Sequence, residues 1–358
     1  MDPQTRRAWV EVDLDALIRN AVALQAQAQR PLLPMIKADA YGLGAVRVAR
    51  ALSAQRPWGF GVATVAEAAD LREAGIAERI VMFTPVLSQD FADLKRLAIT
   101  PTLSSPDDVC RWGADAPWHL SVDTGMNRAG IEWWRAGEIV QAAHQFPPQG
   151  ACTHFHSADS ANETVALQGA RFATAIGQLA RRPLILHAEN SAAVERASLS
   201  PWDVVRPGVF LYGVGGVAGS ALQPEPVAHV RARIVELRTV HAGDTVSYGA
   251  TWQALGARRI ATVPLGYADG YRGLFSNQGQ ALVHGRTVPV VGRVTMDMTM
   301  LDVTDVACDV GDVVTVLGTS SGQHIDVNQM AAAVGLLSYE LLVGLGLRLP
   351  HVYSGGTA

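Results

Sequence analysis

The chain has 358 residues, of which 49% are apolar and 17% charged. This balance is typical of a globular protein with a large core and excludes a disordered or fibrous chain, and the length favours one large domain plus a smaller one. The formal net charge of -4 gives none of the broad positive potential needed to bind nucleic acid or an anionic membrane. We therefore expect a protein that acts on small molecules, with neither of these partners.

Cysteine usage and the start of the chain bear on the compartment. Cys110, Cys152 and Cys308 are far apart, which predicts neither a disulfide framework nor a paired-cysteine zinc site. The first residues are polar, and no apolar run approaches the roughly 20 residues of a membrane span. We expect a cytoplasmic protein.

In chain order, short apolar runs alternate with amphipathic stretches from about residue 8 to 213, and we interpret the runs as strands. A helix is expected after Asp13, a capping residue followed by Leu14, Leu17 and Ile18 at helical spacing. Another is expected over 65–75, which ends in glycine. The expected strands are 8–12, 32–37, 58–64, 79–85, 98–103, 118–124, 150–156, 184–190 and 203–213.

Eight such strand–helix units would close into a parallel (β/α)8 barrel of the TIM type, within the α/β class. Nine runs are one too many. We therefore assign Ala8–Val12 to the sheet of a second domain, and expect the barrel to start with Leu32–Lys37 and to end near Tyr212. An open, doubly wound sheet is the alternative.

After about residue 222 the pattern changes to alternating, β-rich segments with one helix after Asp326. The glycines between 213 and 220, followed by Pro224 and Pro226, indicate a linker. The sequence thus predicts a barrel domain at 10–222 and a mostly-β C-terminal domain at 223–358, joined by the N-terminal strand at 1–12. The expected C-terminal strands are 231–237, 259–263, 280–284, 288–291, 299–303 and 313–317.

Lys37 closes the apolar run that starts at Leu33, which would put it at the carboxyl rim of the barrel, where active sites form. A partly desolvated lysine favours its neutral amine, the form that condenses with an aldehyde. The segment from Lys37 to Gly42, Lys-Ala-Asp-Ala-Tyr-Gly, resembles the cofactor-attachment motif of alanine racemases, which are fold-type III enzymes dependent on pyridoxal 5'-phosphate (PLP). Leu43 stands where that family usually has histidine.

The resemblance continues, in order, over nearly the whole chain. Its further segments are 123–128, 153–155, 187–191, 206–213, 246–252, 266–270, 292–297 and 348–353. One departure matters: Ser121 stands where many alanine racemases have a carbamylated lysine. That carbamate cannot form here, and we hypothesise that a small anion such as chloride replaces it beside Arg128.

The resemblance implies that Lys37 binds the cofactor covalently and is one catalytic base, and that Tyr248 of the partner subunit in a homodimer is the other. Two bases on opposite faces of the substrate Cα suit a racemase, because one removes a proton and the other returns it. It also places Arg206 beside the pyridine nitrogen. A guanidinium only donates hydrogen bonds, so the ring would stay unprotonated and be a weaker electron sink.

The remaining site residues follow from the same resemblance. His154 would lie near the cofactor ring, and His187 would support Arg206 from behind. The phosphate would be bound by Tyr41, Ser191, the Gly208 backbone and Tyr353, with Asn190 at the start of a helix whose amides favour an anion. The amino-acid substrate would be held by Arg128, Met296, Tyr267 and Asp297.

The family implies supply of D-alanine for peptidoglycan. Serine or a broader set of amino acids remains an alternative, since a hydroxyl changes binding by only about 1–3 kcal/mol. A metal-dependent hydrolase is a distant alternative, because Cys152, His154 and His156 alternate along one expected strand, with Asp159 and His187 nearby. A non-catalytic PLP-binding protein is another.

Overall fold

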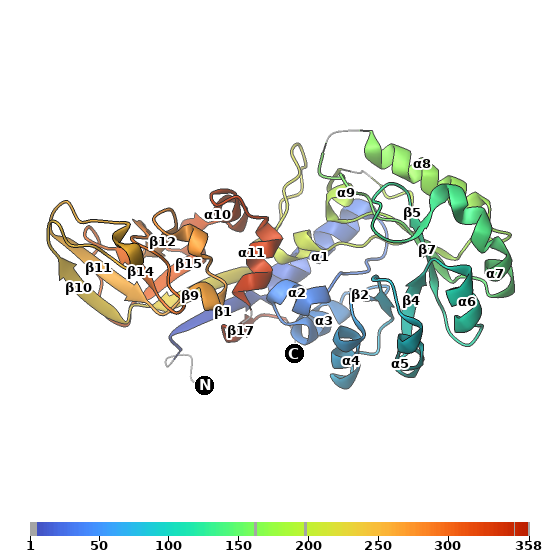
Figure 1. Cartoon of the computed structure of the whole chain (residues 1–358), viewed down its shortest axis with the longest axis horizontal. Coiled ribbons are helices and arrows are strands. Elements are labelled where there is room, and N and C mark those ends of the chain that lie inside the picture. The colour runs from blue at the N-terminus through green and yellow to red at the C-terminus, as the bar shows by residue number, and fades with distance from the viewer. Residues whose placement is uncertain (1–5, 161–162, 197–198, 347, 357–358) are drawn as a thin grey trace.

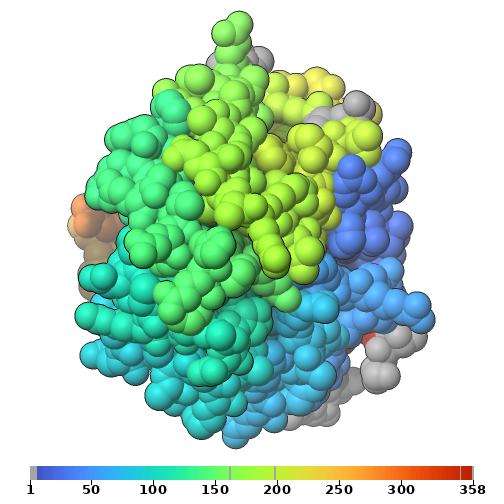
Figure 2. Space-filling view, turned by 90° about the vertical axis from the view of Figure 1, so that its right-hand side faces the viewer, coloured from blue at the N-terminus to red at the C-terminus, as the bar shows by residue number. Residues whose placement is uncertain are grey.

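The computed structural model describes residues 6–160, 163–196, 199–346 and 348–356. Figure 1 shows an elongated molecule with a helix-covered barrel at one end and a mostly-β domain at the other, and the first and last strands lie between them. Viewed from the barrel end, barrel residues form most of the visible face and the C-terminal domain lies behind them (Figure 2).

The barrel contains six parallel strands and two shorter closing segments. The closing segments are joined by a parallel bridge between Leu32 and Val205, and Met35 bridges Gly61 on the other side. Backbone hydrogen bonds support the closure, from Leu33 N to Val205 O at 2.8 Å and from Ile36 N to Gly61 O at 2.9 Å. The alternative of an open sheet is therefore wrong. The paired strands are, in order, β2 (Phe60–Val62), β3 (Ile80–Met82), β4 (Ile99–Leu103), β5 (His119–Asp123), β7 (Gly150–Cys152) and β8 (Ile185–His187), and β6 (Ile131–Glu132) pairs with β5 off this path.

Helices surround the barrel, and both helices predicted from the sequence are present. Asp13 caps the first helix, since its carboxylate accepts a hydrogen bond from Ala16 N at 2.9 Å. Gly75, with φ of 83°, follows the end of α4. No helix within the described part of the chain is long and apolar enough to cross a membrane. The helices are α1 (Leu14–Ala28), α2 (Lys37–Gly42), α3 (Ala45–Ser53), α4 (Val65–Glu73), α5 (Phe91–Arg96), α6 (Pro106–Trp112), α7 (Val140–Gln145), α8 (Thr164–Gly177) and α9 (Ser191–Arg196).

The C-terminal domain is built on two sheets and includes the N-terminal strand β1 (Ala8–Asp13), as predicted. This strand pairs antiparallel with β9 (Ala228–Arg233) and parallel with β17 (His351–Ser354). The helix predicted after Asp326 is α10 (Val327–Ala332), which Asp326 caps. The other elements are β10 (Glu236–Val240), β11 (Arg258–Val263), β12 (Gln280–Val283), β13 (Arg286–Pro289), β14 (Thr299–Asp302), β15 (Val313–Ser320), β16 (Gln323–Ile325) and α11 (Ser338–Leu345).

The expected strand 32–37 is reduced to the isolated bridges given above, and three further expected strands differ from the structure by more than their bounds. The run 203–213 turns into a 3-10 helix, η4 (Val209–Tyr212), after Pro207, which has no N–H for a ladder. The run 150–156 leaves the sheet after Cys152 and continues as a loop, in which Thr153 and Phe155 are buried although they belong to no strand. The run 231–237 is divided between β9 and β10, as the chain passes from one sheet to the other.

Candidate active site

Lys37 begins a turn of unusual handedness at the rim of the barrel. The next four residues, Ala38 to Tyr41, all have φ between 51° and 57°, the left-handed helical region that costs a residue with a Cβ roughly 1–2 kcal/mol. The last strand of the protein supports this turn, because His351 Nε2 lies 2.8 Å from Gly42 O and the Tyr353 hydroxyl donates to Leu43 O at 3.2 Å. The strand predicted to end in Lys37 therefore stops one residue earlier, and residues distant in sequence stabilise the lysine's turn.

The surroundings of Lys37 favour a neutral amine. Burial lowers the pKa of Lys37, the positive charge of Arg128 lowers it further, and the carboxylate of Glu67 opposes both. Arg128 itself forms no hydrogen bond or ion pair within the described ranges. The lysine is thus half-buried, close to one cation and one anion.

The small number of lysines also distinguishes Lys37. Only two of the 29 basic Lys and Arg residues are lysines, Lys37 and Lys95. Lys95 lies on the outer helix α5, where its ammonium pairs with Asp115 at 3.3 Å and lies 5.2 Å from the centroid of the Trp112 ring. Lys37 is therefore the one lysine in the sequence that stands at the barrel rim.

Arg206 is 5% exposed and is held by acceptors on two strands. One terminal nitrogen donates to His187 O at 2.5 Å and lies 2.9 Å from His187 Nδ1. The other donates to Thr153 O at 2.6 Å and Ala188 O at 3.1 Å, and lies 3.4 Å from His154 Nδ1. Within the described residues the Arg206 Nε–H has no acceptor, so it is available to a ligand.

A histidine pair continues inward from Arg206. Because a guanidinium only donates, His187 Nδ1 must accept its hydrogen bond and the ring proton resides on Nε2. His187 Nε2 lies 2.8 Å from His119 Nδ1, so His119 accepts in turn. Burial is the largest cause that lowers the pKa of His119 to about 3, and it lowers the pKa of His187 well below its usual value. Sequence reasoning missed His119, although it points inward on β5 together with Ser121.

His154 is also neutral, because burial, then the charges of Arg206, Arg128 and Lys37, lower its pKa to about 3. The metal-hydrolase hypothesis finds no ligand set in this region. The strand ends at Cys152, and His156 Nδ1 lies 2.6 Å from Ser157 Oγ. Among residues 6–160, 163–196, 199–346 and 348–356, no three His, Cys, Asp or Glu side chains are placed to hold a metal ion.

A cradle of small groups lies at the start of α9. Ser191 Oγ accepts from Gly208 N at 2.9 Å, and Asn190 Oδ1 accepts from Ala193 N at 3.1 Å, which caps the helix. The Tyr41 hydroxyl closes the cradle: a Cβ added at Gly208 would lie only 2.6 Å from it. Hydroxyls and a backbone amide thus surround a space that only glycine leaves open, which fits a phosphate group.

Apart from Tyr353, the predicted residues of the C-terminal domain lie away from the Lys37 turn. Tyr248 is 73% exposed, Met296 53% and Tyr267 47%, while Asp297 pairs with Arg348 at 2.8 Å. In the part of the chain described, no hydrogen bond, ion pair or ring contact involves the Tyr248 side chain or joins this group to Lys37. One chain therefore brings together the residues around Lys37 but leaves these four apart from them.

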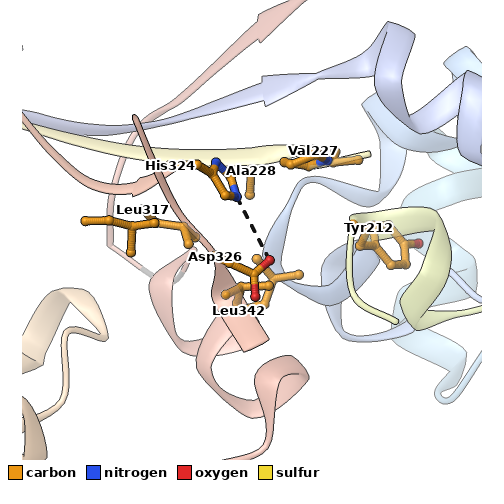
Figure 3. Close-up of a pocket in the computed structure, with 11 residues that line it drawn as sticks. Tyr212, Val227, Ala228, Leu317, His324, Asp326 and Leu342 are labelled. Atoms are coloured by element: carbon orange, nitrogen blue, oxygen red, sulfur yellow. Dashed lines mark ion pairs between the residues drawn. The ribbon is translucent and has the colours of Figure 1, made fainter. Parts of the chain in front are cut away.

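A small hollow of about 10 Å³ between the two domains is separate from the rim site (Figure 3). It is lined by Tyr212, Val227, Leu317 and others, and His324 and Asp326 form an ion pair of 3.9 Å beside it. It has room for about one water molecule, so it is not a substrate site.

A closed barrel with a half-buried lysine of lowered pKa at its rim, followed by a mostly-β domain, is typical of the class of two-domain barrel enzymes with a lysine-bound aldehyde cofactor. The chain belongs to the alanine racemase family. Residues 12–215 match the model of the alanine racemase N-terminal domain, and residues 227–353 match that of the C-terminal domain.

Individual relatives agree along the whole chain. Alanine racemases of Synechocystis and Sorangium cellulosum are each 37% identical, over 97% of this chain and 99% of theirs. The crystal structure of alanine racemase from E. faecalis superposes with a TM-score of 0.92 at 27% identity and 98% coverage of both chains. The enzyme from Bartonella henselae, solved with covalently bound pyridoxal phosphate, gives a TM-score of 0.89 at 25% identity, over 97% of this chain and 99% of that one.

Proposed function

We propose that the protein racemises alanine with pyridoxal 5'-phosphate bound covalently to Lys37. The observation that carries this proposal is the position of Lys37, a half-buried amine with a lowered pKa at the carboxyl rim of a closed barrel. Membership of the alanine racemase family supports the choice of reaction and cofactor. We assign the barrel to residues 10–222 and the C-terminal domain to residues 223–358.

The side chains around the rim fit this cofactor. Tyr41, Ser191 and the Gly208 amide would bind its phosphate, and the Gly208 N–H would then donate to a phosphate oxygen in place of Ser191 Oγ. Asn190 caps the helix behind them and Tyr353 supports the turn. The free Arg206 Nε–H would donate to the pyridine nitrogen, with His187 holding the guanidinium. His154 would lie against the ring. The cofactor, when bound, withdraws electrons from the substrate Cα and so makes its proton acidic.

The neutral state of the histidines determines how Arg206 acts. His187 and His119 cannot pass a proton to the ring nitrogen, because a guanidinium lies between and gives up no proton at neutral pH. Arg206 would therefore leave the ring nitrogen of a bound cofactor unprotonated, which would make that cofactor only a moderate electron sink. This favours return of the proton to Cα over side reactions such as transamination.

Racemisation needs a base on each face of Cα. Lys37 supplies one, and we assign the other to Tyr248 of the partner subunit in a homodimer. The exposure of Tyr248, Met296 and Tyr267 in one chain supports a shared site. Met296, Tyr267 and Asp297 would then line the entrance, and Arg128 would hold the substrate carboxylate, balanced by a small anion near Ser121.

We propose alanine, whose side chain is a methyl group, as the substrate, and serine is the alternative. The product, D-alanine, would serve peptidoglycan synthesis in the cytoplasm. A non-catalytic PLP-binding protein would share the lysine and the cradle but would not invert alanine.

The test is to trap the cofactor and to assay the reaction in the same samples. After reduction with borohydride, peptide mass spectrometry should find the PLP adduct on Lys37, and a chiral assay should show D-alanine formed from L-alanine. Lys37→Ala should lose the PLP adduct, and its rate of D-alanine formation should fall by at least about a thousandfold. The matched control is Lys95→Arg, which keeps the charge beside Asp115 and should lose neither. An adduct without D-alanine would reject the racemase, and an adduct on Lys95 would reject the site.

A further inference from the structure

The turn that carries Lys37 needs an external hold. Four consecutive residues with left-handed backbone are unfavourable by themselves, and Ala38 lies in the first turn of α2, where an amide has no partner within the helix. The amide of Ala38 donates to Glu67 Oε1 at 2.7 Å. A side chain 29 positions along the chain therefore fixes the backbone next to the reactive amine.

The other oxygen of Glu67 is fixed to a different segment. Glu67 Oε2 accepts from Ala63 N at 2.6 Å and from Thr64 N at 3.2 Å, while Thr64 Oγ1 accepts from Glu67 N at 3.1 Å. This is a capping box at the start of α4. The carboxylate thus bridges two neighbouring loops of the barrel rim, with two short hydrogen bonds and one longer one that hold it in one orientation.

The same carboxylate acts on the charge of the amine. The charged groups that influence Lys37 are Arg128, from the loop after β5, and Glu67, and the titratable His154, from the loop after β7, also lies within electrostatic reach of the amine. Arg128 disfavours the ammonium and His154 is neutral. Glu67 is therefore the one negative group in this set that favours a protonated Lys37.

We propose that Glu67 is a positioning residue for Lys37, which tethers the left-handed turn to α4 and, by its negative charge, partly opposes the loss of the amine's proton. The inference rests on the proposed function, in which Lys37 is the reactive amine. A carboxylate is needed because it accepts at both oxygens. Glutamine offers one acceptor and an NH2 group that faces an N–H, and aspartate is too short by one methylene to reach both loops.

The test measures the amine in the PLP-free protein, so that its failure is distinct from failure of the racemase assignment. Trace acylation with acetic anhydride between pH 6 and 10, followed by peptide mass spectrometry, reports the neutral fraction of each lysine, and Lys95 is the internal standard. Glu67→Gln should acylate Lys37 about threefold to tenfold faster at pH 7, because loss of the negative charge favours the neutral amine. Lys95 should not change.

Thr64→Ala is the matched control, because it weakens the capping box of α4 and leaves the contact with Ala38. It should leave the acylation profile of Lys37 at the wild-type position. Unchanged acylation in Glu67→Gln, or an equal increase in Thr64→Ala, would overturn the proposal.

Glu67→Asp tests the tether separately and serves if the glutamine variant does not fold. Because it keeps the negative charge, the acylation profile of Lys37 should stay within about twofold of wild type. Attachment of added PLP, monitored by visible absorbance, should be about tenfold slower, because the turn is no longer held. Attachment at the wild-type rate would show that the tether has no role.

Discussion

At the scale of single residues, Gly208 and Arg206 show how one substitution can change the chemistry of the site. Gly208 has no side chain, so the space beside the Tyr41 hydroxyl stays open. Arg206 brings a positive charge into the barrel, and among the described residues no carboxylate lies within ion-pair distance of it. The carbonyl oxygens around Arg206 replace that carboxylate. Both residues are tightly packed and both would contact the cofactor. Substitutions there should therefore change the affinity for PLP.

The first prediction concerns Gly208→Ala. The new methyl group would lie 2.6 Å from the Tyr41 hydroxyl, so the cradle would have to open and its donors would no longer converge on the phosphate. We expect PLP to bind at least about tenfold more weakly, which corresponds to about 1.4 kcal/mol, as measured by titration of the PLP-free protein. Gly177→Ala is the control, since nothing lies within 4 Å of a Cβ there. Equal affinity in both variants would refute the cradle.

The second prediction concerns pH and the inward histidines. Their pKa values in the folded protein, about 3 for His119 and His154, lie below the ordinary 6.5, so the unfolded chain binds more protons between these limits. The contribution of each neutral histidine to the free energy of unfolding is therefore complete above pH 6.5. It falls by about 1.4 kcal/mol per pH unit as the pH drops from 6.5 towards 3. The thermal midpoint should therefore fall between pH 7 and pH 5. His119→Asn, which can still accept from His187, should show a shallower fall, and an equal fall would contradict the prediction.

At the scale of elements, the rim is formed by loops rather than by the strands themselves. The left-handed turn at Ala38–Tyr41 is held by α4 on one side and by β17 on the other. Because β17 pairs with β1, the N-terminal strand, the last strand and the lysine turn form one continuous structure across the two domains. The geometry of Lys37 thus depends on elements from both ends of the chain.

The third prediction follows from the cost of that turn. Glycine adopts a left-handed backbone without a Cβ penalty, so Ala38→Gly should stabilise the protein or be neutral, with a gain of up to about 1 kcal/mol. Ala173→Gly, at an exposed position in the right-handed helix α8, should instead cost about 1 kcal/mol. Urea unfolding of the PLP-free variants compares the two. A loss of stability in Ala38→Gly as large as in Ala173→Gly would show that the turn is not strained.

At the scale of the whole molecule, the two groups of site residues lie in different domains. The elongated arrangement in Figure 1 keeps the mostly-β domain away from the barrel except at their junction. The exposed Tyr248 and Met296 make sense if a second copy of the chain brings them to the Lys37 of its neighbour. The proposed dimer is then a requirement of the chemistry.

The fourth prediction tests this sharing by mixing two inactive variants. Lys37→Ala and Tyr248→Phe should each lose most activity as pure dimers. After random exchange of subunits, half of the dimers are mixed and each contains one site with both native residues, so about a quarter of wild-type activity should return. No recovery, although mass spectrometry detects mixed dimers, would place both bases in one chain.

The sequence by itself determined much of the alternation of strands and helices in the barrel, and it predicted that the first strand pairs outside the barrel, as β1 does with β9. That Lys37 is the attachment lysine stays a prediction. Period and capping are local, so the pattern from Asp13 to Leu17 or at 65–75 predicts a helix without knowledge of its neighbours. The place of Lys37 at the carboxyl rim followed from the same alternation of strands and helices.

Only the tertiary structure decided the closure between Leu32 and Val205, the handedness of the turn after Lys37, and the roles of Glu67 and His119. Each depends on atoms that meet across tens or hundreds of residues, such as His119 and His187, 68 positions apart. Such contacts leave no periodic trace in the sequence. A left-handed alanine is unfavourable locally and becomes stable only when partners from elsewhere in the fold accept and donate its hydrogen bonds.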